Sequence, residues 1–123
     1  MGALFMLRAQ GYFGWVAIDG KRYDRDAIVH ADGRITPRPT ELSLPYRDDY
    51  FHTPLSEEEL GFIEEEAPEV VIVGAGYKNM MLLTPRAKDI LGRYELKVVS
   101  TQRAIELMGE EKRRFVAILH LTC

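Results

Sequence analysis

The chain has 123 residues, 46% of them apolar, which suits one domain with a core of its own rather than several domains. Its net charge of −3 argues against general nucleic-acid binding, and no apolar run approaches the roughly 20 residues that cross a bilayer. The single cysteine, Cys123, is the last residue, so we expect no internal disulfide, no thiolate metal cluster and a reducing, cytoplasmic setting.

The first part of the chain predicts a β-meander. Residues 13–18 are rich in strand-forming side chains, and Asp19-Gly20 favours a two-residue hairpin turn because both positions need positive φ. A second strand over 27–31 meets a similar pair at Asp32-Gly33. A short strand over 34–36 completes the meander.

Residues 37–54 are predicted to form a loop, because Pro37, Pro39 and Pro45 oppose regular ladder pairing. Such a long connection is often functional or mobile. Its aromatic side chains are the kind that contribute most to protein contacts, unless they fold back onto the sheet. These side chains are Tyr46, Tyr50 and Phe51.

An acidic segment follows, since residues 41–69 hold ten acidic side chains and one basic side chain. Ser56 and Glu59 are spaced as a capping box, with Leu55 and Leu60 as a hydrophobic staple, which predicts a helix that Pro68 ends. The acidic side chains are either a solvated helix face or a docking surface.

Residues 70–121 predict a β-α-β-α-β unit. The run over 70–73 is β-branched throughout, which is typical of a strand buried on both faces. The later elements are a helix from Thr84-Pro85 with a left-handed cap at Gly92, a strand over 95–99, a helix from Ser100 or Thr101 to Met108 closed by Gly109, and a buried strand over 115–119. The whole chain, 1–123, is therefore expected to be one three-layer α/β domain with a mixed sheet.

The C-terminal half carries a recognisable pattern. Residues 71–76 read Val-Ile-Val-Gly-Ala-Gly before a Thr-Pro helix start, and later come Val-Val-Ser-Thr at 98–101 and the run from Glu111 to Leu119. The chain thereby resembles the Mth-type uncharacterised domain family, which includes an adipogenesis-associated protein and a mitochondrial complex I assembly factor. The resemblance implies a three-layer α/β fold and a role in assembly or regulation, but no established reaction.

One candidate ligand site lies where two predicted parallel strands end. Ligands of open α/β sheets settle at the carboxyl ends of strands, where glycines expose backbone N–H groups and a helix presents its positive end. A small anion is the natural ligand, although two glycines after a strand also form a simple turn, and Asn79 stands where a dinucleotide fingerprint needs a third glycine. The candidate residues are Gly74, Gly76, Lys78, Asn79, Thr101 and Arg103.

Catalytic and metal-binding patterns are sparse. His52, near Asp48 and Asp49, is the candidate general base, with a solvated loop histidine as the alternative. His30 and His120 fall in predicted strands and are expected to be satisfied by neighbours. No histidine pair has metal-ligand spacing, so no metal and no cofactor is expected. Nothing in the pattern compels an enzyme.

Two functional hypotheses remain. The first is an interaction or assembly module that binds an unidentified protein through the 37–54 loop and the acidic helix. The second is an anion-binding protein or enzyme with its site between Gly76 and Thr101. The basic run 112–114 could hold an acidic partner or pair with the acidic helix, and a homo-oligomer is compatible with either hypothesis.

Overall fold

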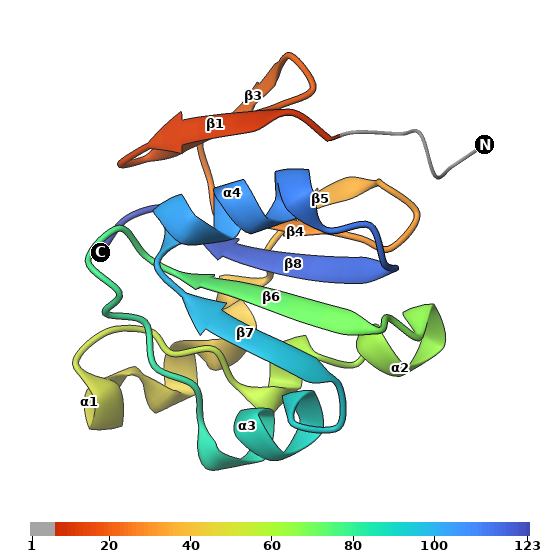
Figure 1. Cartoon of the computed structure of the whole chain (residues 1–123). Helices are drawn as coiled ribbons and strands as arrows, with labels where there is room; N and C mark the ends of the chain where they lie inside the picture. The colour runs from red at the N-terminus through yellow and green to blue at the C-terminus, as the bar shows by residue number, and fades with distance from the viewer. Residues whose placement is uncertain (1–6) are drawn as a thin grey trace.

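The computed structural model describes residues 7–123, and its centre is a five-stranded mixed sheet (Figure 1). From edge to edge the strands are β5 (Ile35–Pro37), β4 (Ala27–Val29), β8 (Phe115–His120), β6 (Val70–Ala75) and β7 (Glu95–Val99). β6 runs parallel to both of its neighbours, whereas β4 is antiparallel to β8 and to β5. The predicted α/β class with a mixed sheet is confirmed.

The two unbroken aliphatic segments occupy the middle of this sheet, as predicted. All six residues of β6 are buried, and β6 pairs in register with β8, so that Val71 lies beside Val116. A β-branched run of this kind is stable only where both of its faces are covered. The direction of the last strand, which the sequence left open, is parallel to β6.

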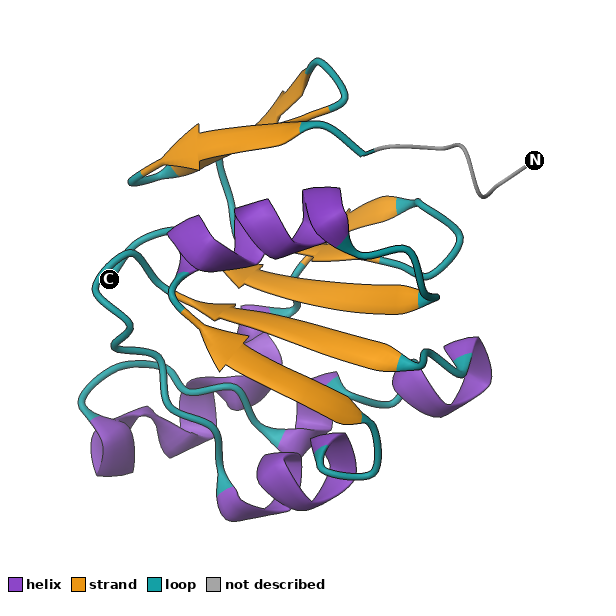
Figure 2. Cartoon of the chain, in the orientation of Figure 1, coloured by secondary structure: helices purple, strands orange, loops and turns teal. Residues whose placement is uncertain are grey.

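Helices cover both faces of the sheet (Figure 2). On one face α4 (Thr101–Glu110) packs its buried side chains, including Ile105 and Met108, against Ile72 and Leu119. On the other face α3 (Pro85–Leu91) and the α2 region (Ile63–Glu66) contribute Leu91 and Ile63 to a second core around Val71, Val73 and Ile118. These helices and the sheet form the three predicted layers.

A second, three-stranded antiparallel sheet lies outside α4 (Figure 1). Its strands are β1 (Ala9–Tyr12), β2 (Trp15–Ile18) and β3 (Lys21–Tyr23), and Val16 and Ile18 join the core of the α4 face. The predicted N-terminal meander is therefore divided, because β4 and β5 belong to the main sheet. β1 was not predicted, since Ala-Gln-Gly-Tyr has no strand-forming run and depends on its pairing with β2.

The two predicted Asp-Gly turns differ. Asp19 (φ 50°) and Gly20 (φ 87°) both take positive φ, which confirms the two-residue hairpin turn between β2 and β3. At the second turn only Gly33 (φ 93°) does so, and the Asp32 carboxylate instead accepts the Arg34 N–H (2.9 Å). The Gly33 N–H donates to the His30 carbonyl (2.9 Å), so the turn begins at His30 and β4 ends at Val29.

The segment predicted to be a loop, 37–54, contains helical turns. A 3-10 helix spans Thr40–Tyr46 and is followed directly by α1 (Arg47–Tyr50). Pro37 does end a strand, β5, but Pro45 lies inside the 3-10 helix. Proline prevents ladder pairing without preventing a short helical turn, which is why the prediction was wrong.

The predicted acidic helix is broken into a 3-10 turn, Glu57–Glu59, and the single α-helical turn of α2. The Ser56 hydroxyl accepts the Glu58 N–H (3.3 Å), not that of Glu59. The Glu59 carboxylate binds Arg38 rather than the Ser56 N–H. The capping-box prediction is therefore wrong, because a distant arginine takes the glutamate.

The two helices of the β-α-β-α-β unit begin as expected. The Thr84 hydroxyl accepts the Ala87 N–H (3.2 Å), and the Ser100 hydroxyl accepts the Arg103 N–H (3.2 Å). Gly92 is right-handed (φ −67°), so its predicted left-handed cap is wrong, and α4 continues through Gly109 to Glu110. Among the described residues every helix falls short of the length and hydrophobicity of a membrane span.

Candidate functional site

The loop after β6 meets the start of α4 at the carboxyl ends of the parallel strands. The Gly76 N–H donates to the Thr101 hydroxyl (2.8 Å), and the Thr101 N–H donates to the Gly76 carbonyl (3.0 Å). Gly74 lies within β6, and a side chain there would touch Thr101 and Ala104 at about 3 Å. Three of the candidate anion-site residues, Gly74, Gly76 and Thr101, thus lie together.

The backbone donors of this loop are already bound within the chain. The Tyr77 N–H donates to the Thr122 carbonyl (2.7 Å), and the N–H groups of Lys78 and Met80 both donate to the main-chain oxygen of Cys123 (3.0 Å each). A Cβ on Gly76 would lie 2.1 Å from the Cys123 carbonyl carbon. An anion at this loop would have to displace residues 122–123.

The charged candidates of the same site point to solvent. Lys78 and Asn79 are exposed on the loop, and Asn79 takes a positive φ of 57°. Arg103 is exposed on α4, where its guanidinium donates to Glu106 (2.8 Å). All three side chains are therefore open to solvent.

The Thr101 hydroxyl links three elements, because it accepts the Gly76 N–H and donates to the His120 carbonyl (2.5 Å). We expect Thr101→Val, which keeps the shape and removes both hydrogen bonds, to lower the free energy of unfolding by about 2 kcal/mol. Urea denaturation followed by circular dichroism measures this change. Thr101→Ser keeps the hydroxyl and is the control; equal stability of the valine and serine variants would contradict the assignment.

His52, the candidate general base, is exposed, as are Asp48 and Asp49 on α1. No hydrogen bond joins His52 to another of the described residues. The structure places these three side chains on one surface segment but does not join them into a catalytic pair.

A buried polar cluster that local sequence patterns did not predict lies around Arg38, whose side chain is 1% exposed. Its guanidinium donates to both oxygens of Glu59 (2.7 and 2.9 Å), to Asp26 (2.9 Å) and to the Pro54 carbonyl (2.8 Å). The Ser43 hydroxyl donates to Glu59 in turn. Every charged group of the cluster therefore has a partner.

Asp26 joins this cluster to the last strand. Its carboxylate accepts from Arg38, from the His120 ring at Nδ1 (2.8 Å) and from the Leu121 N–H (2.9 Å). Burial alone would raise the pKa of Asp26, but the hydrogen bond and charge of His120, the Leu121 N–H and Arg38 together hold it below its usual value. As predicted, His120 is satisfied by a neighbour.

The cluster holds the chain in place and does not present a free cation to a substrate. An open depression of about 590 Å³ borders it, but the Arg38 donors that could bind a ligand there are already engaged. The depression is lined by Arg25, Asp26, Pro37, Arg38, Pro39, Thr40 and Glu41. The cluster therefore anchors residues 38–59 to the sheet.

Further polar contacts fix the same segment. The Tyr46 hydroxyl donates to Glu57 (2.9 Å), and Thr84 at the start of α3 donates to the other oxygen of Glu57 (2.7 Å). The Thr84 hydrogen bond is the main reason that the pKa of Glu57 lies below its usual value. Residues 40–57 are thus tied both to the sheet and to α3.

Two other groups considered in the sequence, His30 and Arg113 of the basic run 112–114, have partners within the domain. His30 is satisfied as predicted, by Glu66 (2.6 Å) and Thr36 (2.7 Å). In the basic run, Arg113 binds Glu95 and Glu111, and this contact lowers the pKa of Glu111 to about 2. Within residues 7–123 no three His, Cys, Asp or Glu side chains converge as a metal site.

Three exposed apolar side chains lie on two segments, the residues directly after α1 and the 80–84 segment. Phe51, directly after α1, is 89% exposed, Met80 is 42% exposed and Leu82 is 54% exposed. The Leu55 N–H donates to the Leu82 carbonyl (2.8 Å) and the Thr84 N–H to the Leu55 carbonyl (3.0 Å), which aligns Leu55 with residues 82–84. We name Phe51, Met80 and Leu82 the apolar platform.

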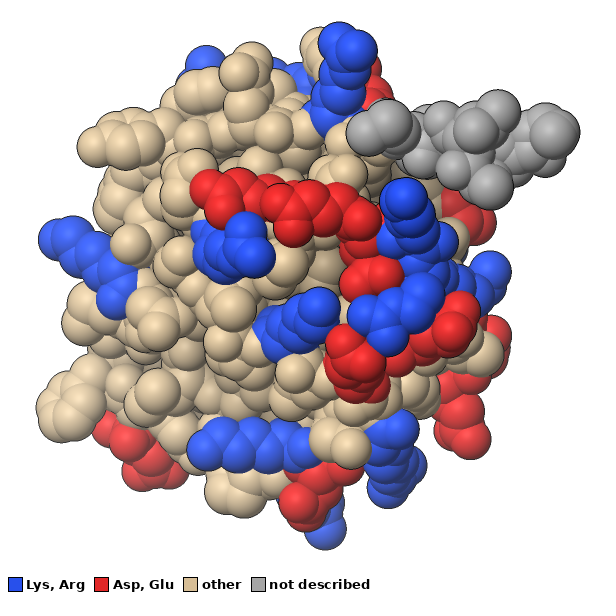
Figure 3. All heavy atoms as spheres, in the orientation of Figure 1, with Lys and Arg blue, Asp and Glu red and all other residues tan. Residues whose placement is uncertain are grey.

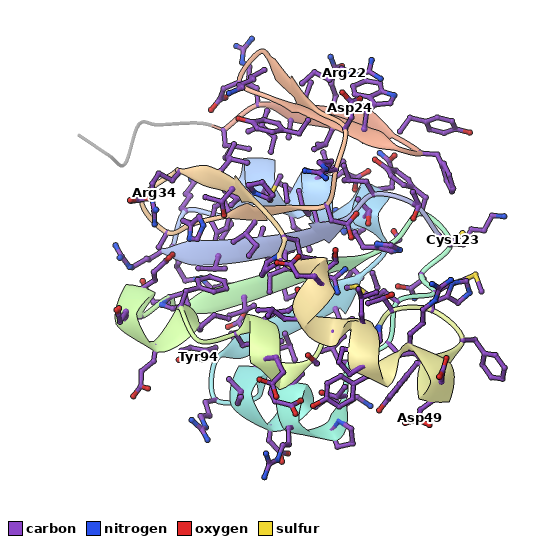
Figure 4. All side chains as sticks on the ribbon, turned by 180° about the vertical axis from the view of Figure 1, so that it is seen from behind. Arg22, Asp24, Arg34, Asp49, Tyr94 and Cys123 are labelled. Carbon is purple, nitrogen blue, oxygen red and sulfur yellow. The ribbon has the colours of Figure 1, made fainter. Side chains whose placement is uncertain are left out.

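Charged side chains flank the platform, since Arg47, Asp48 and Asp49 of α1 and Lys78 of the loop after β6 are exposed. Figure 3 shows charged groups crowded at the centre and right of this face and fewer of them at its left end. Seen from behind, Asp49 of α1 and Cys123 lie on one side of the molecule and Arg34 on the other (Figure 4).

Comparison with known proteins identifies relatives along nearly the whole chain. Residues 10–120 match the family described as "Protein of unknown function (DUF498/DUF598)". A conserved hypothetical protein from Pyrococcus horikoshii OT3 is 33% identical, covers 97% of this chain and 100% of its own, and superposes with a TM-score of 0.83. The protein MT938 is 34% identical, with coverages of 95% and 99% and a TM-score of 0.78.

A more distant structure supports the fold alone. This Mth938-like domain from Bordetella pertussis is 21% identical, covers 98% of this chain and 88% of its own, and has a TM-score of 0.58. No curated protein matches the chain. The matches confirm the Mth-type resemblance found in the sequence.

Proposed function

The chain belongs to DUF498/DUF598, a family of proteins of unknown function, and from this premise we propose that it is a protein-interaction module. It binds a partner protein in the cytoplasm through the apolar platform, and its role is assembly or regulation. The proposal rests on the exposure and the backbone conformation of Phe51.

Phe51 combines two unfavourable features. Its large apolar ring is 89% exposed, and its backbone has a φ of 64°, a left-handed conformation that bulky residues rarely adopt. Such strain persists where the surrounding structure imposes it, and it gathers at functional sites. A partner that covers the ring would recover the hydrophobic free energy that the free domain leaves unused.

Two of the platform residues stand on a segment whose other side chains are buried. Met80 and Leu82 alternate with the buried Met81 and Leu83, so both outward side chains sit on a backbone fixed by the core. Ordering costs on binding are low when the surface is already rigid. Aromatic residues and methionine are enriched in protein interfaces.

The contacts of the Gly74–Gly76 loop favour this proposal over an anion-binding function. The loop's donors at residues 76–78 are bound to Thr101, Thr122 and Cys123, so a new ligand would first have to break those hydrogen bonds. The apolar platform requires no such rearrangement before binding.

Phe51→Asn tests the proposal, because asparagine tolerates the left-handed conformation and lacks the apolar ring. We expect the variant to be as stable as the natural chain or more stable, by up to about 1 kcal/mol, and to lose its bound partner. Thermal denaturation measures the first quantity, and affinity capture from cells expressing the tagged chain measures the second.

The matched control is Leu42→Ser, which removes another exposed apolar side chain from the same segment, outside the platform. The proposal requires proteins that the natural chain and the control recover and the Phe51 variant does not. If all three chains recover the same proteins, the platform is not the binding surface.

A further inference from the structure

The two edges of the main sheet are protected unequally. β5 is three residues long and ends in Pro37, which lacks an N–H, so it offers a poor template for another strand. β7 is five residues long and has β6 as its one neighbour in the sheet (Figure 1). Its residues are exposed or half-buried, and Val98 is 43% exposed.

The outward hydrogen-bonding groups of β7 can be assigned by alternation. The Glu95 N–H points toward β6, since it donates to the Glu69 carbonyl (3.2 Å). Successive residues of a strand direct their N–H and C=O groups to opposite sides. The groups of Leu96 and Val98 therefore face away from β6, toward the open edge.

Side chains on β7 alternate between the two faces of the sheet. Leu96 and Val98 share the α3 face, because they lie beside Val71 and Val73 of β6. Glu95 and Lys97 share the α4 face, where Glu95 binds Arg113 (2.8 Å) and Lys97 lies 3.6 Å from Glu95. A partner strand would meet an apolar row on one face and a charged pair on the other.

We propose that a second copy of the chain pairs with this edge, β7 against β7 in antiparallel orientation, with Leu96 on the two-fold axis. In this register Glu95 of each copy lies opposite Lys97 of the other, and Tyr94 lies opposite Val98. Leu96 exchanges two main-chain hydrogen bonds with its equivalent, and Val98 is covered. The result is one continuous ten-stranded sheet.

Charge selects this register. A two-fold axis through Lys97 would place the two lysines opposite each other, and an axis through Val98 would leave both charges without opposite partners. Like charges directly opposite are destabilising, whereas opposite charges in an antiparallel pair are stabilising. In the proposed register the charged residues form the non-hydrogen-bonded pairs, whose side chains are the closer ones.

Lys97 thus opposes pairing of this edge with most strands and favours pairing with a second β7. A lysine in an edge strand discourages pairing with most strands. Within its own chain Lys97 lies 3.6 Å from Glu95 and 3.9 Å from Glu111, and in the proposed register it also lies opposite Glu95 of the other copy. Since five residues a side give a small interface, we expect a dissociation constant of about 0.1–1 mM.

Sedimentation velocity between about 0.01 and 1 mM tests the proposal. The natural chain should sediment increasingly as a dimer at the upper concentrations. Lys97→Glu and Glu95→Lys should each weaken self-association about tenfold, because each turns two attractions into two repulsions. An equimolar mixture of the two variants should form a heterodimer, since every charge then meets its opposite.

Three results would overturn the proposal: a natural chain that stays monomeric at about 1 mM, a Lys97→Glu variant that self-associates as strongly as the natural chain, or a mixture that forms no heterodimer. Both residues are partly exposed, so we expect folded variants, which far-UV circular dichroism checks. If either variant fails to fold, NMR of the natural chain replaces the variant test. The amide chemical shifts of Leu96 and Val98 must change on dilution if β7 pairs, and unchanged shifts would overturn the proposal.

Discussion

Replacing Arg38 with methionine is expected to lower the free energy of unfolding by about 3–5 kcal/mol, enough to unfold much of a marginally stable domain. Asp26 and Glu59 surround the guanidinium at 2.7–2.9 Å, and their side chains are 15% and 1% exposed. Without Arg38, the buried Glu59 carboxylate would lose its cation, and Asp26 would keep only His120 and the Leu121 N–H as partners. Removing one partner of a buried ion pair is costly for this reason.

Urea denaturation of the Arg38→Met variant measures the effect. Arg22→Met is the matched control, because Arg22 also pairs with an aspartate, Asp24 (2.8 Å), but at the surface, where such pairs contribute roughly 0–1 kcal/mol. Arg38→Met combined with Glu59→Met should recover part of the loss, since one unpaired carboxylate is then gone. Similar stabilities for the Arg22 and Arg38 variants would show that the cluster is not an anchor.

Substituting Gly76 with alanine is expected to cost about 3 kcal/mol or more. The φ of 102° is strained for any residue with a Cβ, which accounts for roughly 1–2 kcal/mol. The new Cβ would lie 2.1 Å from the carbonyl carbon and 2.3 Å from the oxygen of Cys123. That main chain must move, and its hydrogen bonds to Lys78 and Met80, at about 1 kcal/mol each, are then lost.

Gly61→Ala is the control for this substitution. Gly61 has no atom within 4 Å of its ideal Cβ and its φ lies outside the left-handed range, so alanine should change stability by less than about 1 kcal/mol. Thermal denaturation of both variants gives the comparison. A Gly76→Ala variant as stable as Gly61→Ala would mean that residues 122–123 do not occupy the loop.

Much of the central sheet could be predicted because single segments carried the information. A β-branched run such as Val70–Val73 is unstable unless it is buried on both faces, and the boundaries of β7 were predicted to the residue. Thr84-Pro85 likewise contains within two residues the cap and first position of α3.

The elements that were missed depend on partners distant in sequence. Ser56 and Glu59 have the spacing of a capping box, but Arg38, 21 residues before Glu59, holds the glutamate. Asp26 and His120 are 94 residues apart, so no local pattern joins them.

The proposed binding surface was partly visible in the sequence. Phe51 was expected to be a contact residue of the 37–54 segment, and it is exposed, whereas Tyr46 turns inward to Glu57. Its left-handed backbone and the exposure of Met80 and Leu82 required coordinates. The acidic segment is less available than expected, since Glu57, Glu59 and Glu66 are engaged within the domain.

A photoreactive phenylalanine analogue at position 51, introduced into the chain in living cells, tests the interaction role most directly because it keeps an aromatic ring on the platform. The same analogue at position 42 is the reference. The account predicts a discrete protein adduct at position 51 that is absent at position 42 and disappears with Leu82→Asp. No adduct at position 51, or the same adducts at both positions, would contradict it.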